Sequence, residues 1–150
     1  MYTILFPSDY FNRNKIDAEL EQEYEAAIKA GFDVMLFDYS SWFESKKLVL
    51  NQNVDCDLVL YRGWMMKPEL YCEFEKQLKG LGYYVIVDSS SYKRLHEFVN
   101  VYPIIRNDTA PMMKFPLHTR MDVKFLQDIF GRFMVKDYVK STHNRRERPV

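Results

Sequence analysis

Short apolar runs alternate with longer amphipathic stretches over the first hundred residues. Four runs have the length and polar flanks of buried strands, at residues 3–6, 33–37, 56–61 and 84–87. Between them, apolar residues recur at helical spacing. Strands that alternate with helices in this way build an open, mostly parallel sheet. We therefore predict an α/β fold, a Rossmann-like sheet flanked by helices, with an additional helix and strand towards the C-terminus.

Capping residues mark the expected ends of the helices. The first should lie between Asn14 and Gly31, and the second between Pro68 and Gly80. A serine at 89–90 suits the cap of a third helix. Two shorter elements are also expected, a helical turn at residues 40–44 and a brief added strand at 48–50.

The pattern loosens after residue 101, where prolines recur. Asp122 then suits the start of a helix that Gly131 ends. Four residues of this helix should face inward, namely Val123, Leu126, Ile129 and Phe130. The predicted organisation is an α/β domain over residues 1–100, a linker or wrapping arm over 101–121, a helix and strand over 122–141, and a disordered basic tail over 142–150.

The stretch 133–140 alternates in character with a period of two. Lys136 and Lys140 share one side of the predicted strand with Tyr138. Two interpretations follow from this pattern. The lysines and the aromatic ring suit a nucleotide phosphate and base, while the same alternation is typical of the solvated side of an ordinary edge strand.

Composition limits the kinds of partner that we expect. The chain has 150 residues, 47% of them hydrophobic, which is enough for a sizeable core. Its 21 basic and 21 acidic residues cancel, so any site for a polyanion must be local. The tail carries Arg145, Arg146 and Arg148, but Glu147 lies among them. This is a weak electrostatic footprint, and we expect no nucleic-acid partner.

Neither the cysteines nor the histidines form a metal-binding pattern. Cys56 and Cys72 lack CxxC spacing, so buried free thiols are expected. His96, His118 and His143 are widely spaced, and we assign no catalytic residue and no metal ligand. The chain opens with no leader resembling a signal peptide and has no apolar run of about 18 residues. We expect a soluble cytoplasmic protein without a membrane partner.

Ligands of open α/β sheets gather at the carboxyl ends of the strands. Ser8 and Asp9 follow the first strand, and Arg62 and Gly63 follow the third. Gly63 would permit close backbone approach, and Arg62 would clamp a carboxylate or phosphate. Structural alternatives remain, because Arg62 also suits an ion pair and a Ser-Asp pair suits an ordinary turn. Neither a GxGxxG fingerprint nor a P-loop is present.

Four segments together resemble the N-terminal part of a bacterial ATP-grasp protein of the uncharacterised group. The YRGWMMKP sequence at 61–68 and the FMVKDYVKS sequence at 133–141 are the more specific ones. The other two lie at residues 4–11 and 112–117. The likeness extends from the start of the chain to about Ser141.

The resemblance implies a pre-ATP-grasp α/β region, followed by the first strand of the ATP-grasp fold. In that family a lysine of this strand reaches the nucleotide phosphates, which makes Lys136 the candidate, with Lys140 as a second contact. Complete members resemble ligases that join a carboxylate to an amine through an acyl-phosphate, with ATP and Mg²⁺. Lysines and metal ions recur there because phosphate charge must be neutralised.

The sequence departs from the family after Ser141. The adenine-contacting segment and the Mg²⁺ ligands of a complete ATP-grasp fold have no counterpart here, so we expect no catalysis by this chain alone. A truncation, a changed reading frame and a naturally short protein all fit this pattern. An alternative from another class is an interaction module, which would self-associate or bind a partner chain through the edge strand at 133–140.

Overall fold

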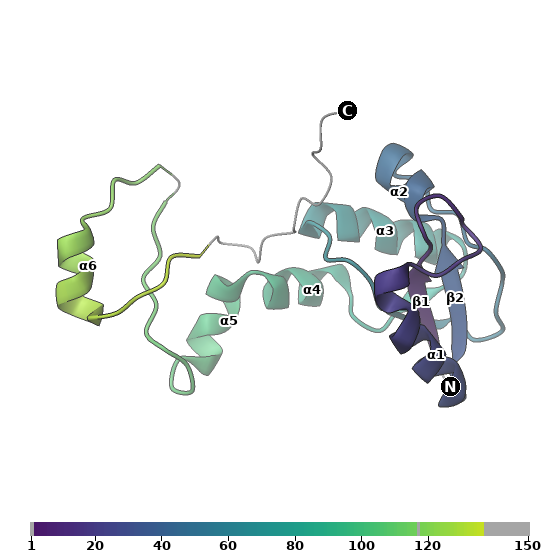
Figure 1. The fold of residues 1–150 in the computed structure, drawn as a ribbon, viewed down its shortest axis with the longest axis horizontal. Coiled ribbons are helices and arrows are strands. Elements are labelled where there is room, and N and C mark those ends of the chain that lie inside the picture. The colour runs from purple at the N-terminus through teal and green to yellow at the C-terminus, as the bar shows by residue number, and fades with distance from the viewer. Residues whose placement is uncertain (1, 117, 137–150) are drawn as a thin grey trace. The chain divides into compact units, whose positions relative to one another are not determined.

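The computed structural model of the protein describes residues 2–116 and 118–136 (Figure 1). The chain divides into two compact units, Met1–Tyr92 and Lys93–Val150, and each is described by itself. The first unit contains the sheet. Residue 100, where the predicted α/β domain ends, lies within helix α5, Phe98–Ile105, of the second unit.

Four parallel strands form one sheet in the order β2-β1-β3-β4. This arrangement confirms the predicted open α/β fold. The strands are β1 Thr3–Pro7, β2 Asp33–Phe37, β3 Leu58–Tyr61 and β4 Tyr84–Val85. Strand β4 is shorter than its apolar run, although the Ile86 N–H still donates to the Val59 carbonyl. Strand β1 is the centre of the sheet because it is paired on both sides.

The helices of the first unit follow the predicted order. They are η1, a 3₁₀ turn at Ala18–Leu20, α1 Glu21–Lys29, α2 Tyr39–Ser45 and α3 Pro68–Gly80. Helix α4, Ser89–His96, begins in the first unit and ends in the second. The predicted start at Asn14 is wrong, because Asp17 is the cap and accepts from the Glu19 N–H. The Asn14 N–H instead donates to the side chain of Asn12 in a closed loop.

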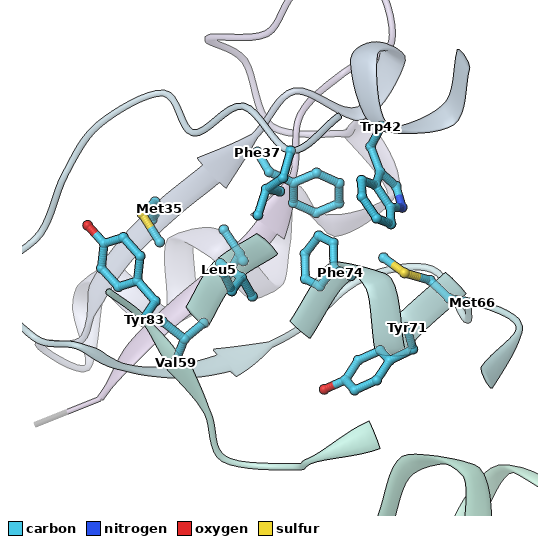
Figure 2. Packing of buried hydrophobic residues seen from close by; sticks show 11 residues of the cluster. Leu5, Met35, Phe37, Trp42, Val59, Met66, Tyr71, Phe74 and Tyr83 are labelled. Atoms are coloured by element: carbon cyan, nitrogen blue, oxygen red, sulfur yellow. The ribbon is translucent and has the colours of Figure 1, made fainter. Parts of the chain in front are cut away.

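One face of the sheet, here the α3 face, carries the larger core. Leu5, Met35, Phe37 and Val59 project from the strands, and α2 and α3 cover them. The ring of Phe74 lies 5.1 Å from that of Phe37 and 5.0 Å from that of Trp42, both nearly edge-on (Figure 2). Aromatic packing of this kind adds to the stabilisation from burial.

The opposite face, here the α1 face, is covered only in part within the first unit. Phe6 and Leu36 are buried against η1 and α1 through Leu20 and Ala27. Towards β3 and β4 the cover ends, and Leu60 and Tyr84 are 36% and 51% exposed. Parallel sheets are normally covered on both faces, so this half of the α1 face is unusual.

Residues 49–52 close the β2 edge of the sheet. The Asn51 N–H donates to the Leu36 carbonyl at 2.9 Å, and the Leu36 N–H donates to Asn51 Oδ1 at 2.8 Å. Gln52 Nε2 donates to the Val34 carbonyl. An isolated antiparallel bridge joins Phe37 to Leu50 where a brief strand was expected. Backbone and side-chain groups of residues 49–52 thus take the place of a fifth strand at this edge.

The second unit contains α5 Phe98–Ile105 and α6 Val123–Phe130. No helix was expected from residue 101, but α5 continues through Pro103. Helix α6 begins as predicted, since Asp122 accepts from the Phe125 N–H, and it ends at Gly131. Four residues of α6 were predicted to face inward, but only Leu126 of them is buried. Val123 and Ile129 are half-exposed, and Phe130 is partly buried.

The predicted strand at 133–140 is wrong for its first half. Residues 133–136 follow α6 without strand structure. An isolated strand is not stable, and the described part of the second unit offers it no partner strand. Residues 137–140, including Lys140, lie outside the described part of the chain, as does the tail.

The cysteines and the lengths of the helices bear on two further expectations. Cys56 and Cys72 are free thiols, as predicted, but they are only partly buried. Among the described residues no helix has the length and apolar character needed to cross a membrane.

Phe74 is expected to be essential for the α3-face core. Phe74→Ala should lower the free energy of unfolding by about 3–5 kcal/mol, because a fully buried ring is replaced by a cavity. Urea denaturation followed by circular dichroism measures the change. Phe11→Ala, at a ring that is almost wholly exposed, is the control and should stay within about 0.5 kcal/mol of the parent. Equal stability of the two variants would contradict this description of the core.

Candidate functional site

The order of the strands defines a switch point between β1 and β3. The chain moves from β1 to β2 on one side and from β3 to β4 on the other. Leu5 pairs with Tyr61, so the residues that follow β1 and β3 lie beside one another at the carboxyl edge. The predicted substrate residues therefore come together at the place where open α/β sheets bind ligands.

Ser8 joins the loop after β1 to helix α2. Its side chain is wholly buried, and its Oγ accepts from the Tyr39 N–H at 3.1 Å and donates to the Asp9 carbonyl at 3.1 Å. The Ser8 N–H donates to the Phe37 carbonyl. The Ser8 hydroxyl is therefore engaged in hydrogen bonds within the protein.

Asp9 organises the loop that follows. Its Oδ1 accepts from the N–H groups of Phe11 and Asn12, at 2.9 and 3.1 Å. This is the turn chemistry that a Ser-Asp pair allows. The carboxylate fixes the loop at the carboxyl edge of β1.

Arg62 pairs with Glu23 of α1 through two parallel hydrogen bonds. Nε bonds one carboxylate oxygen, and Nη2 bonds the other at 2.6 Å. Hydrogen bonding to Glu23 raises the pKa of Arg62. Both side chains are about half exposed, so the pair stabilises the fold by only about 1 kcal/mol or less. The acid comes from a helix of the α1 face.

A shallow, open cavity of about 310 Å³ lies beside this ion pair. Ile4, Phe6 and Leu60 line it from the strands, and alanines of α1 line it from the helix. The cavity occupies the partly covered α1 face. Its lining is apolar, and Arg62 and Glu23 are its charged residues.

Gly63 is required by packing. A Cβ built there would lie 2.8 Å from Pro7 Cδ and 2.8 Å from the Tyr61 hydroxyl. Such contacts are too short for carbon, so the loop after β3 packs directly against the end of β1 at this glycine. The close approach expected at Gly63 is made by the protein itself.

Trp64 and Tyr61 fill the rest of the switch point. Trp64 Nε1 donates to Asp17 Oδ2 at 3.3 Å, and the Tyr61 hydroxyl donates to the Trp64 carbonyl at 2.5 Å. Burial raises the pKa of Tyr61 well above its ordinary value, so it remains a neutral donor. These groups hold the Arg62–Trp64 loop in place.

Two further tyrosines order the same edge and were not predicted. The rings of Tyr71 and Tyr92 stack at 3.9 Å, and burial raises the pKa of both. The Tyr71 hydroxyl donates to the Val87 carbonyl, and Tyr92 bonds the backbone of Met66. Their spacing in the sequence gives no signal, because only the fold brings α3 and α4 together.

Asp38 and Asp88 cap helices after the two edge strands. Burial raises the pKa of Asp38, but hydrogen bonds from Ser41 and its neighbouring serine outweigh this effect and leave the pKa lowered. The Ser90 hydroxyl and the Ser91 N–H lower the pKa of Asp88 to about 2. Both carboxylates are therefore ionised acceptors at neutral pH.

Lys136 is exposed and belongs to the second unit. The structure thus gathers four predicted residues, Ser8, Asp9, Arg62 and Gly63, in the first unit, and describes Lys136 separately. In the described ranges, no three acidic, histidine or cysteine side chains are arranged to hold a metal ion.

Comparisons with protein-family models, with curated proteins and with solved structures find no match to this chain.

Gly63→Ala should destabilise the protein by about 1–3 kcal/mol, because the new methyl group overpacks the contact with Pro7 and Tyr61. Gly80→Ala is the matched control. A Cβ there meets nothing within 4 Å, and alanine is favoured over glycine at a helical position. Thermal unfolding compares the two. A Gly63→Ala protein as stable as its parent would show that the glycine is not needed for packing.

Proposed function

We propose that the chain is the N-terminal, pre-ATP-grasp part of a bacterial ATP-grasp protein related to carboxylate–amine ligases. In this proposal it contributes scaffold and a nucleotide-phosphate contact, without catalysing the reaction alone. The observation that carries the proposal is the gathering of Ser8, Asp9, Arg62 and Gly63 at the switch point of a parallel sheet. That is the position at which such folds bind their ligands.

Arg62 is the group at this edge that would meet an anionic substrate. Its guanidinium is half-exposed and already holds a carboxylate, that of Glu23, in two-point fashion. A substrate carboxylate or phosphate would offer the same geometry and would compete with Glu23. Ser8, Asp9 and Gly63 would act by fixing the loops on either side.

Lys136 is the proposed contact to the ATP phosphates, with Lys140 beside it in sequence. Lys136 is exposed, so its charge is accessible to a ligand. The described residues contain no group of metal ligands, and Mg²⁺ does not fit a site of their making. It would arrive bound to the nucleotide, and further ATP-grasp strands would supply its protein ligands.

Mg·ATP is expected to raise the melting temperature of the 150-residue protein by a few degrees at saturating concentration, because a ligand stabilises the state that binds it. Lys136→Ala should lose most of this shift. Lys124→Ala, at an exposed lysine of α6, is the control and should retain it. Differential scanning fluorimetry gives the measurement. No shift in the parent protein would reject nucleotide binding.

An interaction module is the second candidate. The observation that favours it is the exposure of three successive apolar side chains, Phe133, Met134 and Val135. Apolar residues displayed together are typical of contact surfaces. In this candidate function the segment pairs with the same segment of a second copy.

Self-pairing predicts a monomer–dimer equilibrium in sedimentation velocity at increasing concentration. Met134→Glu should shift the equilibrium towards monomer, because it places a charge in the apolar contact. Leu81→Glu, at an exposed leucine in the first unit, should leave it unchanged. A parent protein that stays monomeric at the highest concentration would reject self-association.

A further inference from the structure

The loop after β1 is closed and well fixed. Ser8 and Ile16 form an antiparallel bridge at its base. Inside the loop, the Asp9 N–H donates to the Lys15 carbonyl at 2.7 Å, and the Lys15 N–H donates to that of Asn12 at 3.0 Å. These hydrogen bonds define the backbone between residues 8 and 16. The backbone at its tip is therefore held in place.

Phe11 lies at this tip and is 90% exposed. Its N–H is held by Asp9 Oδ1, so the ring is presented from a constrained backbone. The ring of Tyr10 contacts it edge-on at 5.1 Å. An exposed ring on a fixed loop contributes little to the stability of the fold. Such a ring suits a role in binding.

Helix α2 extends this display into an aromatic surface made of Tyr10, Phe11, Tyr39 and Phe43. The ring of Phe43 lies 6.4 Å from that of Tyr10 and 6.1 Å from that of Tyr39, and it is 49% exposed. The surface is built at the carboxyl ends of β1 and β2. Neither the substrate residues nor Lys136 belong to it.

Charged side chains of both signs lie in the segments that carry the aromatic surface. Its acids are Asp9, which accepts two N–H groups, Asp38, which caps α2, and Glu44, which accepts from the Tyr10 hydroxyl. The exposed side chains of Arg13, Lys15 and Lys47 form no ion pair within the described residues. A fourth cation, Lys46 Nζ, donates to the Phe43 carbonyl at 2.5 Å and lies 5.4 Å from the centre of the Phe43 ring. The four cations outnumber the three acids by one.

We propose that the aromatic surface binds single-stranded nucleic acid. Bases would stack on Phe11 and Phe43, and backbone phosphates would meet the four cations, Arg13, Lys15, Lys46 and Lys47. Aromatic rings interleaved with basic side chains are the chemistry of sequence-tolerant strand binding. A site of this kind needs only local charge, so it is compatible with a net charge of zero. An apolar peptide would use the rings but not the cations.

Fluorescence anisotropy of a labelled single strand of about 12 nucleotides, oligo(dT) or oligo(rU), tests this site. Binding at low salt is expected, with log Kd rising against log salt with a slope of about 2–3 for four phosphate contacts. Phe11→Ala should weaken binding about fivefold or more, and Phe11→Trp should preserve it. Lys46→Gln with Lys47→Gln should reduce the salt slope by about 1.4.

Two controls separate this site from the rest of the protein. Phe125→Ala, at an exposed ring of α6, and Lys124→Ala, at an exposed lysine of the same helix, should bind the oligonucleotide as the parent does. Lys136 is no part of the aromatic surface, so the nucleotide-binding proposal can fail while this one holds. Absence of binding by the parent at low salt, or equal affinity of Phe11→Ala and the parent, would overturn the proposal. Equal competition by inorganic polyphosphate, which has no bases to stack, would also overturn it.

Discussion

A sheet of parallel strands is normally covered on both faces, and this requirement governs the first unit. Strand β1 lies at the centre of the sheet, and its side chains alternate between two cores because successive residues of a strand point to opposite faces. On the α3 face the requirement is met by α2 and α3, whose aromatic rings close over Phe37. On the α1 face a single helix and its 3₁₀ turn serve β1 and β2, and Leu60 and Tyr84 remain in contact with water.

At the carboxyl edge, the residues expected to bind a ligand make contacts within the protein. Ser8, Asp9 and Gly63 are the residues expected at a switch point, and each makes a contact that the loops need in order to hold their shape. Arg62 differs from them, since its partner Glu23 lies on the surface and the pair can exchange. In the proposed function Arg62 recognises an anion at this edge, where Asp9, Asp38 and Asp88 are engaged in a turn and in helix caps.

The sequence was sufficient for the α/β class, because four apolar runs separated by amphipathic stretches have few other solutions. Local capping chemistry was less decisive: Asn14 and Asp17 both suit a helix start, and the closed loop that excludes Asn14 depends on the bridge between Ser8 and Ile16. The stretch at 133–136 alternates like a strand, yet alternation does not supply a pairing partner. The positions of the site residues followed from strand order, whereas the engagement of Arg62 by Glu23 required the structure.

The closed β2 edge limits where a further strand can join the sheet. Asn51 and Gln52 occupy the hydrogen-bonding groups on which another strand would have to build, so that side cannot grow. Strand β4 has no comparable cover from side chains in the first unit, and it adjoins the bare half of the α1 face. Within the described part of the first unit, the β4 edge is therefore the one at which another strand would fit, and a helix leading to that strand would also cover Leu60 and Tyr84.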